Sequence, residues 1–175
     1  PQPPGRPQRR EPLGLAGPAG DLRQTQEQPL LEPLHVRTER RHTGALDAEG
    51  LTVAVCAHGL DFTYPTEHGA LAQRIAAQGA LLSEFPPGTA PRRAHFPQRN
   101  RLIAGLALGT VVVEAALQSG SLSTASWAAD QGREVFAVPG SVHSPVSAGC
   151  HRLIRDGAKL VETPDEVLAE LSLPL

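Results

Sequence analysis

The sequence predicts an α/β protein in which helices cover both faces of a parallel sheet. Short apolar runs rich in β-branched residues recur along the chain, as expected of strands buried on both faces. Stretches with helical spacing of apolar residues separate these runs, and this alternation favours parallel strands. The predicted strands are residues 51–57, 80–84, 110–115, 134–138 and 159–161.

The predicted helices have recognisable ends. Gly79, Gly132 and Gly157 each follow a helical stretch, and glycine readily takes the left-handed conformation that stops a helix. Thr163 is the expected N-cap of the last helix. The predicted helices are residues 37–47, 67–78, 121–131, 147–156 and 163–171, with one more beginning near Phe96.

Length and composition limit the class of protein. The 175 residues suit one domain with its own core, and a net charge of -2 means that any nucleic-acid contact must come from a local basic patch. Cys56 and Cys150 have no CxxC spacing, which favours a reducing compartment and no metal or other cofactor. No apolar run approaches the roughly 20 residues of a membrane span, and no leader is visible, so we expect a cytoplasmic protein without membrane contact.

Three segments are expected. Residues 1–34 hold 8 of the 17 prolines and few branched or aromatic side chains, so we predict a disordered Pro-rich segment. Residues 35–163 form the predicted α/β domain, and residues 164–175 form a C-terminal helix and tail. Because the sequence has no methionine and begins with Pro1, we expect it to be a piece of a longer product.

The most informative stretch is the helix that begins near Phe96. Arg99 and Arg101 flank Asn100 there, and Arg92 and Arg93 precede it, so four guanidinium groups lie between positions 86 and 110 without any Asp or Glu. A helix N-terminus carries partial positive charge, and arginines beside it form a site for phosphate or another anion. The alternative is a solvated basic loop.

A second candidate anion site is Ser119-Gly120-Ser121, which lies between a predicted strand and a predicted helix. Gly120 would let the backbone approach a ligand, and Ser121 would cap the helix. The alternative is that Ser121 is an N-cap only. No P-loop or GxGxxG pattern is present, and a serine-hydrolase reading of Ser83 or Ser141 lacks a Gly-x-Ser-x-Gly turn.

The candidate residues follow the predicted strands in loops. In parallel sheets, ligands bind beyond the carboxyl ends of the strands, so we expect these loops to gather at one edge of the sheet and to form the site. They are residues 58–61, 85–98, 114–121 and 139–147.

Taken in order, these motifs make residues 42–167 resemble the DprA/Smf family of DNA-processing proteins. The resemblance implies an extended Rossmann-like domain that binds single-stranded DNA, forms a homodimer and loads the recombinase RecA during natural transformation (competence) and recombination. Catalytic activity is not established for this family, so the resemblance implies none for this chain. The motifs are Gly59-Leu60-Asp61, Tyr64-Pro65, Ser83-Glu84, Pro87-Gly88, Phe96-Pro97, Arg99-Asn100-Arg101, Val113-Glu114-Ala115, Ser119-Gly120-Ser121 and 135–140.

The resemblance also implies a DNA site with no catalytic residues. Its expected members are Arg92, Arg93, Phe96, Arg99, Asn100, Arg101, Ser119, Gly120 and Ser121. The first βαβ portion of the family, with a Ser-Gly-Leu-Ala-Arg-Gly-Ile-Asp segment, has no counterpart here. We therefore expect a fold truncated on its N-terminal side. Two alternatives stay open: a Rossmann-like enzyme acting on a nucleotide or phosphoribosyl compound, and a nonfunctional remnant.

Overall fold

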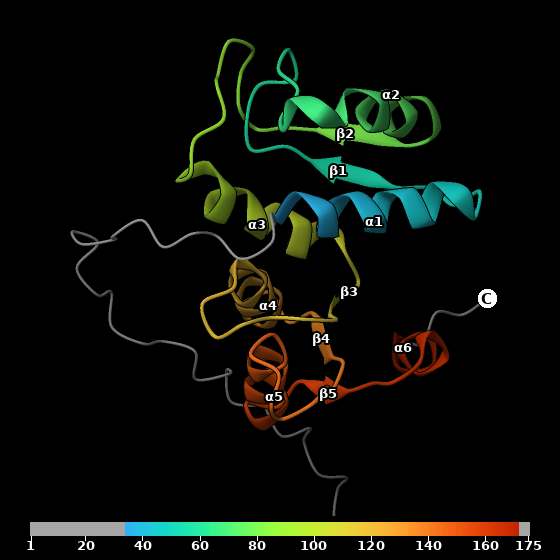
Figure 1. Ribbon diagram of the computed structural model, residues 1–175, viewed down its shortest axis with the longest axis vertical. Coiled ribbons are helices and arrows are strands. Elements are labelled where there is room, and N and C mark those ends of the chain that lie inside the picture. The colour runs from blue at the N-terminus through green and yellow to red at the C-terminus, as the bar shows by residue number, and fades with distance from the viewer. Residues whose placement is uncertain (1–33, 172–175) are drawn as a thin grey trace, which may run out of the picture. The chain divides into compact units, whose positions relative to one another are not determined.

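The computed structural model describes residues 34–171, and within this range the chain divides into two compact units (Figure 1). Residues 34–103 form the first unit and residues 104–171 the second, with the boundary inside one helix. The disorder predicted for residues 1–34 falls almost entirely outside the described residues, as do the last four residues of the predicted tail. Within the described range, no helix is long and apolar enough to cross a membrane.

The observed elements follow the predicted order, with shorter strands. The helices are α1 (Leu34–Asp47), α2 (Gly69–Gln78), α3 (His95–Leu106), α4 (Gly120–Asp130), α5 (Ala148–Arg155) and α6 (Pro164–Leu171), with a 3₁₀ turn at Thr66–His68. The strands are β1 (Val53–Val55), β2 (Ala80–Leu82), β3 (Gly109–Val112), β4 (Glu134–Ala137) and β5 (Lys159–Leu160).

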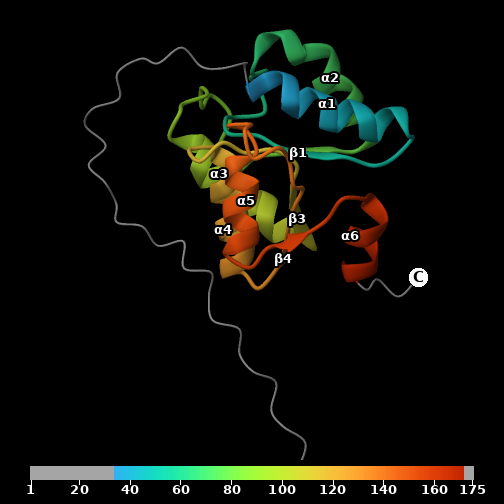
Figure 2. The same ribbon diagram turned by 60° about the horizontal axis from the view of Figure 1, so that its bottom comes forward.

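The first unit is built on a parallel pair of strands. β1 and β2 lie side by side with Val53 opposite Ala80, and the crossover between them is α2. Helices α1 and α2 pack against each other and lie together on one face of this pair (Figure 2). Leu46, Val55 and Ile75 are buried, because each of these elements turns its apolar side inward.

The second unit has a three-stranded parallel sheet in the order β3-β4-β5. α4 and α5 cover one face and α6 lies against the other, as both views show (Figures 1 and 2). Phe136, on the central strand, is fully buried, and so are Cys150, Leu153 and Val161. The prediction of parallel strands with helices on both faces is confirmed in this unit.

The predicted fold class, parallel strands flanked by helices, is confirmed, and the five described strands pair as two parallel sheets. Within each sheet, every strand pairs with the next strand along the chain after a crossover through one α-helix. β1 pairs with β2 across α2, β3 with β4 across α4, and β4 with β5 across α5. Apolar periodicity identifies a strand but not its neighbour, which depends on contacts far apart in the chain.

The three predicted glycine ends are observed, but Gly79 ends α2 with an extended φ of −153° and not in the left-handed conformation. Gly132 and Gly157 have φ values of 69° and 103°, the left-handed region that favours glycine, directly after α4 and α5. Before α6, the Glu166 amide donates to Thr163 Oγ1 at 3.4 Å, and the Glu166 carboxylate accepts from the Glu162 amide at 2.9 Å. This reciprocal arrangement satisfies amides that have no partner within the helix.

One half-buried histidine of the first unit predicts a pH dependence of stability. His42 Nδ1 lies 2.8 Å from Thr52 Oγ1. Burial lowers the pKa of His42 below its usual 6.5, and the nearby Arg41, Arg99 and His68 lower it further. Below pH 6.5 the unfolded chain therefore binds a proton that the folded chain does not.

The free energy of unfolding should thus fall as the pH drops from 6.5 toward the lowered pKa, and should not change for this reason above pH 6.5. His42→Gln should remove that part of the loss. Urea unfolding at pH 7.5 and 5.5 measures it, with His143→Gln in the loop after β4 as the control. An unchanged loss in His42→Gln would contradict the assignment to His42.

Candidate nucleic-acid interface

The candidate interface of the first unit lies where β1 and β2 end, because parallel strands send their following loops to the same edge. Hydrogen bonds tie the two loops together. The amide of Gly59 donates to the carbonyl of Thr89 at 2.9 Å, and the amide of Gly88 donates to Asp61 Oδ2 at 2.8 Å. The prediction that these two loops gather at one edge is confirmed within this unit.

Gly59 lets the two loops approach each other closely. A Cβ atom at this position would lie 2.6 Å from the carbonyl oxygen of Pro86 and 3.1 Å from Pro87 Cα. Both are backbone atoms, which can move only if the whole loop moves. Glycine at this position therefore keeps the loops in contact.

Arg99 and Asn100 attach α3 to the end of β1. The Arg99 guanidinium donates from Nη1 to the carbonyl of Val55 and from Nε to Asn100 Oδ1 at 3.3 Å. Asn100 is only 8% exposed. Burial lowers the pKa of Arg99, although a guanidinium stays charged at neutral pH. These two residues therefore have structural partners within the protein.

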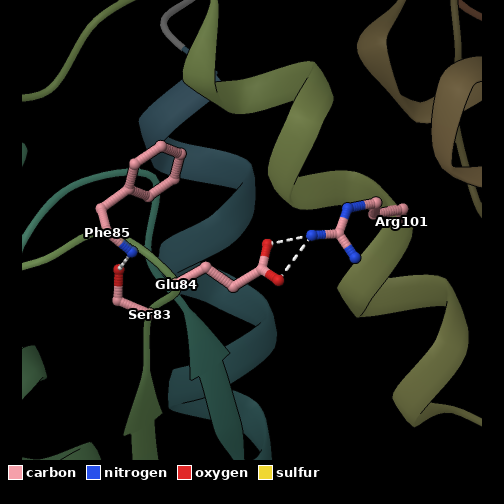
Figure 3. Close-up of polar contacts among 4 residues, drawn as sticks. All are labelled: Ser83, Glu84, Phe85 and Arg101. Atoms are coloured by element: carbon pink, nitrogen blue, oxygen red, sulfur yellow. Dashed lines mark hydrogen bonds and ion pairs between the residues drawn. The ribbon is translucent and has the colours of Figure 1, made fainter.

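Arg101 reaches the end of β2 instead. Its Nη2 contacts both carboxylate oxygens of Glu84, and both side chains are 45% exposed (Figure 3). The motif Arg99-Asn100-Arg101 thus connects α3 to the last residue of β1 and to the segment that follows β2. The Arg99 contact is half-buried and the Arg101 contact is exposed.

Arg92 and Arg93 lie in the loop immediately before α3, and both side chains are exposed. The carbonyl of Arg92 accepts from the amide of His95, the first residue of α3, at 3.0 Å. Within residues 34–171, neither guanidinium takes part in a hydrogen bond or ion pair. The structure therefore places two exposed positive charges at a helix N-terminus, where partial positive charge is already present.

Aromatic rings gather beside this helix start. The rings of Tyr64 and Phe96 have centroids 5.9 Å apart at 60°, and the Arg99 Cζ atom lies 5.8 Å from the Phe96 centroid. The rings of Phe85 and His95 stack at 4.3 Å. His95 Nδ1 lies 3.1 Å from the Ala57 carbonyl, so this nitrogen carries the proton and donates.

Tyr64 is a residue that the sequence analysis missed as a member of the site. Its side chain is 46% exposed while its ring edge contacts Phe96. A signal was present in the sequence, because four of the six aromatic residues fall within residues 62–96. Clustering of a rare residue type around one basic stretch indicates a shared surface more strongly than the overall aromatic content does.

The remaining predicted residues belong to the second unit. Ser119, and not Ser121, is the N-cap of α4: Ser119 Oγ accepts from the Ser121 amide at 3.3 Å. The earlier serine caps because its backbone is extended, with φ −70° and ψ 138°, whereas Ser121 already lies inside the helix. A methyl group on Gly120 would meet no heavy atom of the described residues within 4 Å.

The surroundings of Ser83 and Cys56 do not activate either side chain as a nucleophile. Ser83 Oγ donates to the His58 carbonyl at 2.7 Å and accepts from the Phe85 amide at 3.0 Å, so its proton is not directed at an imidazole. Burial raises the pKa of the Cys56 thiol, although the charge of Arg99 opposes this. Among residues 34–171, no three His, Cys, Asp or Glu side chains are placed to hold a metal ion.

Known proteins are similar to this chain in sequence and in fold. Residues 39–172 match the family described as DNA recombination-mediator protein A. Protein Smf of Escherichia coli is 50% identical over 135 residues, which cover 77% of this chain and 36% of that protein. The X-ray structure of DNA processing protein A (DprA) from Streptococcus pneumoniae is 46% identical with a TM-score of 0.70, over 75% of this chain and 47% of that chain.

A second solved structure, DNA processing protein A from Helicobacter pylori, is described for its single-stranded DNA binding mode. It is 30% identical to this chain with a TM-score of 0.63, over 69% of this chain and 55% of that chain. The chain therefore spans between 36% and 55% of the lengths of these relatives.

Proposed function

This chain belongs to the DprA/Smf family of DNA-processing proteins, and from this membership we propose that it binds single-stranded DNA without catalysing a reaction on it. The observation that carries the proposal is the pair Arg92 and Arg93. Both are exposed at the start of α3, in a stretch from position 86 to 110 that has no acidic residue. Exposed guanidinium groups bind backbone phosphates without reading the base sequence.

Stacking supplies the second part of the proposed site. Phe96 lies in the first turn of α3, just after the loop with the two arginines, and Tyr64 contacts its ring while staying 46% exposed. Bases of a single strand are free to stack on such rings, and stacking tolerates any base. We therefore propose that the arginines hold phosphates while Tyr64 and Phe96 contact bases.

The other predicted residues have two different roles in this proposal. Arg99 and Asn100 hold α3, and so place Arg92, Arg93 and Phe96. In the second unit, Ser119, Gly120 and Ser121 form the start of the eleven-residue helix α4. We propose that these three residues contact DNA as well, because the N-terminus of a helix carries partial positive charge.

We further propose that DNA binding serves natural transformation and recombination, with RecA as a partner and a homodimer as the assembled form. The support is the family membership, since the family is described as a recombination mediator. The chain spans about half or less of the length of most of the compared relatives. The wider role is therefore part of the proposal.

Competition distinguishes this function from the alternatives. A fluorescent oligo-dT of 30 nucleotides bound to the chain should be displaced by unlabelled oligo-dT. A duplex of equal length should displace it far less, because paired bases cannot stack on Tyr64 and Phe96. Equal displacement by the duplex would contradict the single-strand preference. Displacement by a mononucleotide at similar concentration would favour an enzyme that acts on nucleotides.

A further inference from the structure

We infer that Glu84 is an internal competitor of the DNA phosphate for Arg101, and that it thereby limits the affinity of the site. This inference rests on the proposed function. Glu84 occupies Arg101 in the described structure through both carboxylate oxygens (Figure 3). A phosphate group that approaches Nη2 of Arg101 must therefore replace a carboxylate and not merely water.

Glu84 is held in this position by its neighbours in the chain. Ser83 Oγ donates to the carbonyl of His58 at 2.7 Å, and the same oxygen accepts from the amide of Phe85 at 3.0 Å. The backbone on both sides of Glu84 is thus fixed to the loop after β1. This turn places the Glu84 carboxylate beside Arg101 of α3 (Figure 3).

Because the Arg101–Glu84 pair is exposed, exchanging the carboxylate for a phosphate costs little free energy. Both side chains are 45% exposed, and water screens ion pairs of this kind so strongly that they add little to stability. A phosphate carries a full negative charge and several acceptor oxygens, which match the guanidinium as well as a carboxylate does. Arg99 differs, because its guanidinium is largely buried against the Val55 carbonyl. Arg101 is the arginine of this motif that can change partners.

The competition has a distinct effect on salt dependence. In the wild type, a phosphate binds at Nη2 of Arg101 only when the Glu84 carboxylate leaves it. This contact therefore changes the number of ions released on DNA binding very little. In Glu84→Gln no carboxylate is released, and the contact should add one phosphate to the count. The slope of log K against log salt should then become steeper by about 0.7. Affinity for oligo-dT should rise about three- to tenfold.

The test is oligo-dT titration from 50 to 200 mM salt with the wild-type chain, Glu84→Gln, Arg101→Ala and the double variant. Glu84→Gln should bind more tightly than wild type, and the same change on the Arg101→Ala background should have no effect. Glu67→Gln removes the same charge from the exposed 3₁₀ turn before α2 and is the matched control. It should change affinity by less than Glu84→Gln does.

The outcomes separate the two proposals. If wild type binds and Glu84→Gln binds equally or more weakly, Glu84 only positions Arg101 and the competition is overturned while DNA binding stands. If Glu84→Gln strengthens binding equally with and without Arg101, the effect is one of general charge and the inference is again overturned. If neither the wild type nor Glu84→Gln binds oligo-dT, both the proposed DNA binding and the competition by Glu84 fail.

Discussion

Replacing Arg92 and Arg93 together by alanine is expected to weaken the binding of oligo-dT by about tenfold or more at 100 mM salt. Both side chains are exposed at the start of α3, so their loss removes two phosphate contacts without disturbing a buried group. The slope of log K against log salt should become shallower by about 1.4, since each phosphate contact on a single strand contributes about 0.7. Fluorescence anisotropy at several salt concentrations measures both quantities.

The matched control removes two positive charges from the second unit. Arg152→Ala/Arg155→Ala changes two exposed arginines on α5, one of which pairs with Asp156 at 3.5 Å. If binding depends on net charge alone, both double variants should lose affinity equally. That result would remove Arg92 and Arg93 from the site.

Arg99→Ala should destabilise the first unit by about 2–3 kcal/mol. Its guanidinium is largely buried and donates to Val55 and Asn100, and hydrogen bonds from charged groups contribute about 1.5–3 kcal/mol. Removing it also leaves Asn100 Oδ1 without this donor in a residue that is 8% exposed. Hydrogen exchange of the β1 and β2 amides measures the loss of stability in the first unit. The fluorescence of Trp127 would instead report on the second unit.

Arg101→Ala provides the comparison, because it removes an arginine from the same helix. Its pair with Glu84 is 45% exposed on each side, so the expected loss of stability is no more than about 1 kcal/mol. Equal destabilisation by both variants would contradict the different roles that the structure gives these two arginines.

The sequence was sufficient to predict most of the secondary structure. The apolar runs at 110–115 and 134–138 contain β3 and β4, and the glycines at 132 and 157 stop α4 and α5 as predicted. These signals are local, since they depend on side-chain periodicity and on the conformational freedom of glycine. The separation of five strands into two sheets is not local, and no feature of a single strand specifies it.

The sequence named the residues of the candidate site, but it did not show which partner each of them contacts. The motif Arg99-Asn100-Arg101 was expected to face DNA as a unit. The structure instead gives Arg99 the Val55 carbonyl and gives Arg101 the Glu84 carboxylate. Spacing along a helix shows which residues share a face, but not which partner from a distant strand meets each one. For the same reason the ring contact between Tyr64 and Phe96 could not be read from the sequence.

The central claim is that this chain binds single-stranded DNA through arginine–phosphate contacts. The most direct measurement is the titration of fluorescent oligo-dT with the purified wild-type chain at 50, 100 and 200 mM salt. We predict saturable binding at the lowest salt, and a log–log slope steeper than −1.4, the value expected of the two contacts made by Arg92 and Arg93 alone at about 0.7 each. A folded chain that ignores oligo-dT at 50 mM salt, or binds it independently of salt, would contradict the claim.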